Sequence, residues 1–216
     1  MTLSTMLSTM SVGMLRTCGI FILTLVGSLP LGMIVALLRK SRFSVVRGII
    51  RVYISVIRGT PLMLQLLVWY FGPYYLFDLS IRGWRFPALI LGFILNYAAY
   101  FAEIYRGGIQ SIPRGQYEAA EVLGYSKSQT FMTIVLPQVI KRIIPAMGNE
   151  IITLVKDTSL AFVLGIMEMF TTAKAIAASQ VSMLPYAVAA AIYWGFTLFA
   201  EALIGRVEKK LSYYHD

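Results

Sequence analysis

The longest apolar stretch of the sequence, residues 18–38, contains 21 residues without a charged side chain. Because an α-helix rises about 1.5 Å per residue, a helix of this length covers the roughly 30 Å hydrocarbon core of a bilayer. The stretch is followed by Arg39, Lys40 and Arg42, as expected where a helix leaves the membrane. Residues 1–13 contain no basic side chain, and the apolar stretch is longer than that of a signal peptide, so we interpret it as a retained membrane span.

Four further apolar stretches predict four further spans, and the composition agrees with this. Hydrophobic residues make up 58% of the chain and charged residues 13%, about half of the usual charged share. A soluble protein with so few charges would lack the polar surface needed to cover its apolar interior. We therefore predict an all-α integral membrane protein, a single transmembrane domain over residues 1–216. Its five helices are expected at residues 18–38, 61–77, 86–105, 151–170 and 184–204.

The basic residues indicate how the chain is oriented in the membrane. Fourteen of the 19 Lys and Arg residues fall in residues 39–60, 106–149 and 205–216, whereas four fall in the segments expected on the other side. Because cytoplasmic segments carry the excess of Lys and Arg, we expect the N-terminus outside and the C-terminus inside. The net charge of +9 is thus explained by residues that flank apolar stretches. Nucleic-acid binders instead use a soluble basic face, so we expect contact with lipid and none with nucleic acid.

Few residues are available for catalysis or metal binding. One cysteine and one histidine exclude a Cys/His metal centre and a His-based triad. The sequence also lacks the G-x-x-x-x-G-K-[ST] phosphate loop, so the chain is not expected to bind a nucleotide in that way. A membrane enzyme using Glu150 and Asp157 as acid and base is a competing interpretation, but no nucleophile or cofactor motif accompanies them. We expect no catalytic residue, no metal and no cofactor in this chain.

The polar segment 106–149 predicts two short helices at the membrane surface. Residues 116–123 are good helix formers, and Gly124 occupies the position of a helix-ending glycine. Ser126, with a glutamine three residues later, matches a capping box that begins a second helix. Pro137 and Pro145 suggest that this second helix ends or bends nearby. Such an element suits docking into a groove of a partner protein, or alternatively an amphipathic loop lying on lipid headgroups.

The same segment carries a spaced set of residues that is specific to one family. The set is Glu118, Ala119, Ala120, Gly124, Ile134, Leu136 and Pro137. It resembles the "EAA" loop of permease subunits of ATP-binding-cassette importers. The segments 57–62, 96–104, 106–109 and 148–160 are similar to the polar-amino-acid branch of that family, and the resemblance covers residues 12–212.

The resemblance implies a set of partners. In that family two permease subunits form the pathway, as a homodimer or a heterodimer, in the prokaryotic plasma (inner) membrane. Two cytoplasmic ATPase subunits bind ATP and Mg²⁺ and supply the hydrolysis, and an extracytoplasmic binding protein delivers the amino acid. The loop would contact the ATPase through one group of residues, although Glu118 could instead only favour the first turn of its helix. The group is Tyr117, Glu118, Ala119, Ala120, Gly124, Tyr125 and Ser126.

Charges close to the start of the fourth expected span mark a candidate substrate pathway, because ionisable groups in the membrane are costly. Glu150 and Asp157 are seven residues apart and share one helix face, with Lys156 about 100° around the helix. An amino acid needs an acceptor for its ammonium group and a donor for its carboxylate. We assign the first role to Glu150 or Asp157 and the second to Lys156. An internal ion pair, or a lysine that snorkels to the interface, is the alternative.

Polar residues on two other spans are further candidates. Asn96, Tyr100 and Glu103 recur on one face of the third span, and Gln65 lies in the second. They could line the pathway or pack against a second permease subunit. The competing function for the whole chain is a gated channel for small polar solutes, which would need no ATP.

Overall fold

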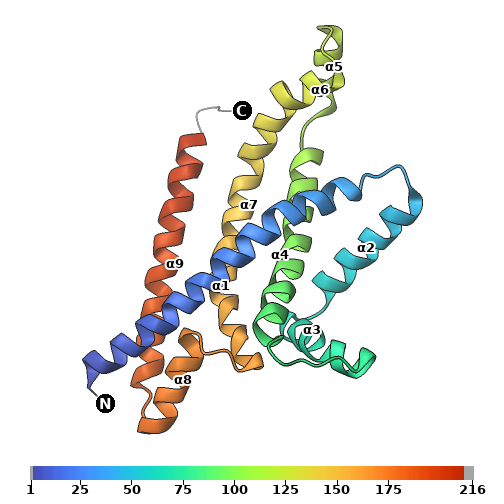
Figure 1. Ribbon diagram of the computed structural model, residues 1–216. Coiled ribbons are helices and arrows are strands. Elements are labelled where there is room, and N and C mark those ends of the chain that lie inside the picture. The colour runs from blue at the N-terminus through green and yellow to red at the C-terminus, as the bar shows by residue number, and fades with distance from the viewer. Residues whose placement is uncertain (1, 212–216) are drawn as a thin grey trace.

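The computed structural model describes residues 2–211, and within these residues all regular secondary structure is helical (Figure 1). The single histidine, His215, lies outside the described residues. The α-helices are α1 (Leu3–Leu38), α2 (Ser44–Gly59), α3 (Leu62–Phe77), α4 (Arg85–Gln110), α5 (Arg114–Val122), α6 (Lys127–Gln129), α7 (Leu136–Asp157), α8 (Met169–Gln180) and α9 (Leu184–Leu211). A π-helical segment, Thr130–Val135, joins α6 to α7, and a 3-10 segment, Thr158–Leu164, follows α7.

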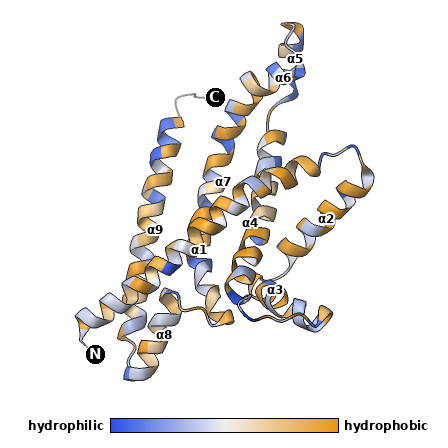
Figure 2. Cartoon of the chain, viewed as in Figure 1, coloured by the Kyte–Doolittle hydropathy of each residue, from blue (hydrophilic) through white to orange (hydrophobic). Residues whose placement is uncertain are grey.

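Four helical segments are long and apolar enough to cross a membrane: Leu3–Leu38, Arg85–Gln110, Lys127–Leu164 and Leu184–Leu211. The pair α2 and α3 passes the same test jointly but is bent by 115°, so the described residues hold four spans, or five if the pair counts as one. This confirms the prediction of an all-α membrane protein. The hydropathy colouring shows apolar residues along most of these helices (Figure 2).

The bend between α2 and α3 follows from the sequence at that point. Thr60 precedes a proline, which disfavours the helical conformation, and its backbone is extended at φ −123° and ψ 147°. Pro61 is extended too, and α3 begins at the next residue. The span expected at 61–77 is therefore only the second half of a broken element.

The fourth expected span, 151–170, does not correspond to one helix. The α-helix ends at Asp157, and the 3-10 segment after it ends at Leu164, where Gly165 follows with a left-handed backbone of φ 65°. In the other direction the helix continues through Pro137 and Pro145, so it does not end at either proline. The π-helical turn just before Pro137 accommodates the first proline, and membrane helices tolerate such residues when neighbours satisfy the backbone.

The core lies mainly between α1 and α4, which cross in contact near the centre of the molecule (Figure 1). Phe93 and Phe101 of α4 and Ile20 of α1 are fully buried there. The helices approach closely at Gly32, where an added Cβ would lie 2.9 Å from Cβ of Phe101 and 3.1 Å from the carbonyl oxygen of Ala98. Tight contact between small residues is how membrane helices associate without a hydrophobic drive.

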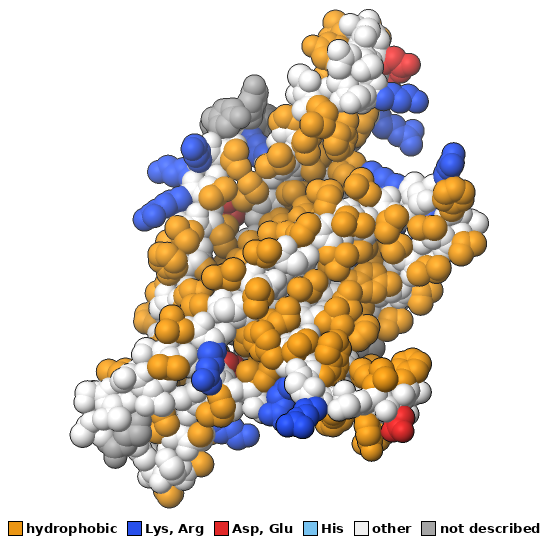
Figure 3. Space-filling view, viewed as in Figure 1, with side chains coloured by type: hydrophobic (Ala, Val, Ile, Leu, Met, Phe, Trp, Pro, Cys, Tyr) orange, Lys and Arg blue, Asp and Glu red, His pale blue; other side chains and the backbone are white. Residues whose placement is uncertain are grey.

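The outer face of α1 is apolar and exposed. Leu15 is 72% exposed and Val26 is 68% exposed, and the space-filling view shows hydrophobic side chains over most of this face (Figure 3). Basic side chains lie towards the two ends of the molecule in the same view. This is the distribution expected of a surface that faces lipid between two polar interfaces.

Candidate functional site

A polar pocket of about 380 Å³ lies between the start of α3, the middle of α4 and the last turns of α7. The break at Thr60–Leu62 forms one wall. The polar residues that line the pocket are Thr60, Asn96, Tyr97, Tyr100, Glu150, Thr153 and Asp157. Four of the six substrate-pathway residues expected from the sequence therefore meet in one cavity.

Tyr97 is a pocket residue that the sequence did not single out. Its hydroxyl donates a hydrogen bond of 2.7 Å to Oδ2 of Asp157, and its side chain is 2% exposed. The bond joins α4 to the end of α7 and fixes the direction of the Asp157 carboxylate. The signal available in the sequence was its position next to Asn96, within the segment 96–104 that resembles the polar-amino-acid branch of the family.

Glu150 and Asp157 line the pocket from positions two turns apart on one face of α7, as their spacing indicated. Lys156 is exposed and is not among the residues that line the pocket. Its position around the helix directs it away from the face shared by the two acids.

Gln65 lies beside the pocket and holds the break between α2 and α3 together. Its Nε2 donates to the carbonyl oxygen of Ile57 at 2.8 Å and to that of Thr60 at 3.0 Å. Its Oε1 accepts a 3.0 Å hydrogen bond from Nδ2 of Asn96. Gln65 thus satisfies backbone carbonyls that the bend frees, and it positions Asn96 at the pocket wall.

Arg58 is a second residue near the pocket that sequence reasoning did not select. Its guanidinium carbon lies 5.2 Å from the centroid of the Tyr100 ring, in a cation–π arrangement. It also lies 3.8 Å from Oε2 of Glu103. Its place depends on the break after α2, which turns the end of that helix towards α4.

Glu103 is the centre of an ion-pair cluster rather than a lining residue of the pocket. It pairs with Arg39 at the end of α1, with Arg58, and with Arg106 one turn further along α4 at 2.7 Å. Its side chain is only 13% exposed. A partly buried carboxylate with several guanidinium partners ties the ends of α1, α2 and α4 to one another.

The expected surface helices form a tip that projects beyond the other helices (Figure 1). Gly124 has φ 76°, and the amide of Tyr125 donates to the carbonyl of Ala120 at 3.0 Å, which is the hydrogen-bond pattern of a Schellman helix end. Ser126 and Gln129 exchange both bonds of a capping box. The predictions of a helix-ending glycine and of a capping box are thus confirmed.

The tip exposes large apolar side chains. Val122 is 88% exposed and Leu123 is 73% exposed, and Tyr117 and Tyr125 are exposed as well. Glu118 and Ala119 are also exposed, whereas Ala120 is buried against the chain. Apolar groups on a projecting element are typical of a surface that another protein covers.

Comparison with known proteins identifies one family model and several permease proteins that are similar to this chain. Residues 28–213 match the family model described as "Binding-protein-dependent transport system inner membrane component". The chain is 39% identical over 182 residues to a probable amino-acid permease protein of Bacillus subtilis, YxeN, covering 84% of this chain and 81% of that protein. It is 35% identical over 208 residues to the L-cystine transport system permease protein TcyB of the same organism, covering 95% and 87%.

Solved structures agree with the sequence matches. A chain from the crystal structure of an amino acid ABC transporter with histidines has a TM-score of 0.87 and 33% identity, and the match covers 94% of each chain. A chain of the inward-facing MetNI methionine ABC transporter has a TM-score of 0.70 at 15% identity, covering 98% of this chain and all of that one. The second likeness supports the fold alone.

Proposed function

Since the chain belongs to the family of binding-protein-dependent transport system inner membrane components, as an amino-acid ABC transporter permease, we propose that its polar pocket is the route of a polar amino acid in ATP-driven import. The observation that carries the proposal is the convergence of Glu150, Asp157 and Tyr97 in one cavity among apolar helices. Ionisable groups at such a depth are costly and mark substrate pathways.

The pocket has the chemistry to bind a zwitterion. Glu150 and Asp157 accept hydrogen bonds from the ammonium group, and the hydroxyl of Tyr97 holds Asp157 in place. Two cations are candidates for the carboxylate: Lys156, next to Asp157, and Arg58, whose guanidinium lies over the pocket residue Tyr100. Both cations are exposed and lie outside the pocket lining, but we favour Arg58, because its guanidinium packs against Tyr100, a residue that lines the cavity. The pocket volume of about 380 Å³ falls within the usual range for small-molecule sites.

The projecting tip is proposed as the element that docks cytoplasmic ATPase subunits. Its exposed apolar groups would enter a groove of the ATPase, with Glu118 as the charged contact and the Gly124 turn as the rigid joint. The tip continues into α7 through the π-helical segment, and α7 carries Glu150 and Asp157. Movement of the ATPase would therefore reach the pocket along one continuous helix. ATP and Mg²⁺ would be bound by that partner and not by this chain.

The remaining partners follow from the proposed orientation. The basic excess supports a cytoplasmic position for the tip and the C-terminus. The bacterial relatives support a chain that crosses the plasma (inner) membrane of a prokaryote several times. A second permease subunit would complete the pathway. The extracytoplasmic binding protein would deliver the amino acid at the opposite end, and alternating access would follow from each partner's preference for one of two states.

The proposal is tested by uptake of labelled amino acids into vesicles that hold the assembled transporter. Asp157→Asn and Glu150→Gln remove one acceptor charge each, and we expect the apparent substrate affinity to fall about ten- to a hundredfold, as for loss of a hydrogen bond to a charged group. Glu201→Gln is the matched control, because Glu201 is an exposed carboxylate of α9 away from the pocket. Unchanged uptake by both pocket variants, at equal amounts in the membrane, would contradict the assignment.

A further inference from the structure

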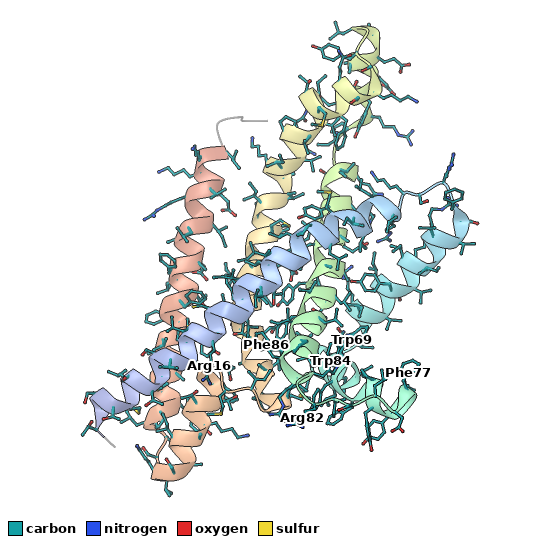
Figure 4. The ribbon with its side chains drawn as sticks, viewed as in Figure 1. Arg16, Trp69, Phe77, Arg82, Trp84 and Phe86 are labelled. Atoms are coloured by element: carbon teal, nitrogen blue, oxygen red, sulfur yellow. The ribbon has the colours of Figure 1, made fainter. Side chains whose placement is uncertain are left out.

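A second and larger cavity, of about 1000 Å³, lies at the end of the molecule opposite the tip. Three arginines line it from separate parts of the chain: Arg16 from α1, Arg82 from the loop before α4, and Arg85 from the first turn of α4. The side-chain view labels two of them, with Arg82 at the lower edge of the molecule and Arg16 on α1 (Figure 4). The substrate pathway proposed above does not use this cavity.

The positive charge at this cavity has no carboxylate partner in the described residues 2–211. The ion pairs found in that part of the chain all involve Glu103, at the other end of α4. Arg16 uses one guanidinium nitrogen to donate to the carbonyl oxygen of Met167 at 2.9 Å. A guanidinium group has five donors, so most of the donor capacity at the cavity remains for an anion.

Aromatic residues of the kind found at lipid headgroups surround the cavity. Tyr70 and Phe86 line it, and Trp84 beside it donates from Nε1 to the carbonyl oxygen of Trp69 at 3.0 Å, which fixes the loop to α3. Figure 4 shows Trp69, Trp84 and Phe86 gathered at this level. Tryptophan and tyrosine concentrate where a membrane protein meets the headgroup region.

The cavity is also continuous with a lipid-facing surface. Ile20 and Ile166 contribute to its walls, which are mostly apolar. On α1 just beside it, Leu15 is 72% exposed and Leu23 is 45% exposed. An anion that binds here would have an apolar surface beside it. A phospholipid needs such a surface for its acyl chains, whereas a free anion does not.

We propose that this cavity binds the phosphate headgroup of an anionic phospholipid, with Arg82 and Arg85 as its main donors and Arg16 at its side. Guanidinium groups bind phosphate oxygens in a two-pronged geometry, and each basic residue near an anionic bilayer surface strengthens binding about fivefold. The bound lipid would join the loop before α4 to α1, two elements that the chain itself connects there by few polar bonds.

Tryptophan fluorescence gives a direct test, because the chain has only three tryptophans. In a Trp194→Phe background of the full-length chain, the remaining Trp69 and Trp84 report on this region. The protein is placed in phosphatidylcholine vesicles that contain brominated phosphatidylglycerol or brominated phosphatidylcholine as quencher. We expect brominated phosphatidylglycerol to associate about 25-fold more strongly than brominated phosphatidylcholine, from about fivefold for each of the two main arginines. This advantage of phosphatidylglycerol should fall about fivefold in each of Arg82→Gln and Arg85→Gln.

Controls separate the proposal from its alternatives. Lys174→Gln removes a positive charge of α8 outside this cavity and should leave the advantage intact. Equal quenching by brominated phosphatidylcholine in all variants shows that the tryptophans remain in the bilayer. Loss of the advantage when inorganic phosphate replaces chloride at constant ionic strength would overturn the lipid assignment in favour of a free anion. An advantage that is absent in the parent protein, or that survives the double arginine variant, would overturn the proposal altogether.

Discussion

The hydroxyl of Tyr97 on α4 and the carboxylate of Asp157 on α7 are joined by a 2.7 Å hydrogen bond that bridges 60 residues of sequence. The tyrosine is almost fully buried and Asp157 is half-buried, so the bond is partly shielded from water. This single contact sets the direction of an acid in the proposed pathway and links the two helices that form most of the polar pocket.

Removal of that hydroxyl should destabilise the protein. In Tyr97→Phe the carboxylate loses a donor in a buried place, and we expect a loss of about 1.5–3 kcal/mol in the free energy of unfolding. Thermal unfolding in detergent measures the change. Tyr105→Phe is the matched control, because the Tyr105 hydroxyl lies 3.4 Å from the Leu29 carbonyl and makes only a weak bond. Equal effects of the two variants would contradict the special role of Tyr97.

The turn at the tip should depend on Gly124. Its φ of 76° opposes a side chain, so Gly124→Ala should cost about 1 kcal/mol in the folded turn and weaken ATPase association about fivefold. Gly115→Ala, in the same tip, adds a Cβ into open space and should bind normally. Co-purification with the cognate ATPase over a range of concentrations gives the ratio. A normal affinity for Gly124→Ala would show that the turn is not part of the contact.

The crossing of α1 and α4 should depend on Gly32. A Cβ added there meets Cβ of Phe101 at 2.9 Å and a backbone oxygen at 3.1 Å, so Gly32→Ala forces the helices apart at a cost of about 1–3 kcal/mol. Gly72→Ala on α3 meets nothing within 4 Å and serves as the control. Melting temperatures of the two variants, compared in one detergent, check this. A Gly32→Ala protein as stable as the control would mean that the contact can relax.

The buried carboxyl group of Glu168 should make stability depend on pH. It begins α8, outside the spans, and burial raises its pKa while hydrogen bonds from the amides of Thr171 and Phe170 lower it. Because the net shift is upward, its contribution to stability is full below the ordinary glutamate pKa of about 4.3 and is lost as pH rises through the folded-state value.

We therefore expect the melting temperature to decrease as pH rises above about 4, and Glu168→Gln to reduce that decrease. The difference between the two proteins isolates Glu168 from the other acids of the chain. Identical pH profiles for the parent protein and the variant would sink this interpretation.

Local rules allowed part of the molecule to be predicted from the sequence. The Gly124 turn and the capping box of Ser126 depend on bonds between residues at most five apart, so their signatures can be read directly. The apolar stretches likewise identify an all-helical membrane protein, because only helices satisfy the backbone within a single segment in lipid.

Long-range contacts limited the prediction of the pocket. The pairing of Tyr97 with Asp157 depends on how α4 and α7 pack, which no local pattern encodes. The spacing of Glu150 and Asp157 placed them on one face of the helix and Lys156 on another. It did not indicate which of these faces turns towards the pocket. Arg58 reaches Tyr100 only because of the break at Thr60 and Pro61, which hydropathy does not detect.

The central claim, that a cytoplasmic ATPase drives an amino acid through this chain, is tested most directly by the initial rate of uptake with and without ATP. Vesicles holding the permease, its ATPase and the binding protein would be loaded with ATP or with ADP on the side that the tip faces. We predict accumulation above the external concentration with ATP and essentially none with ADP. Equal rates of downhill entry under both conditions would identify a gated channel and contradict the account.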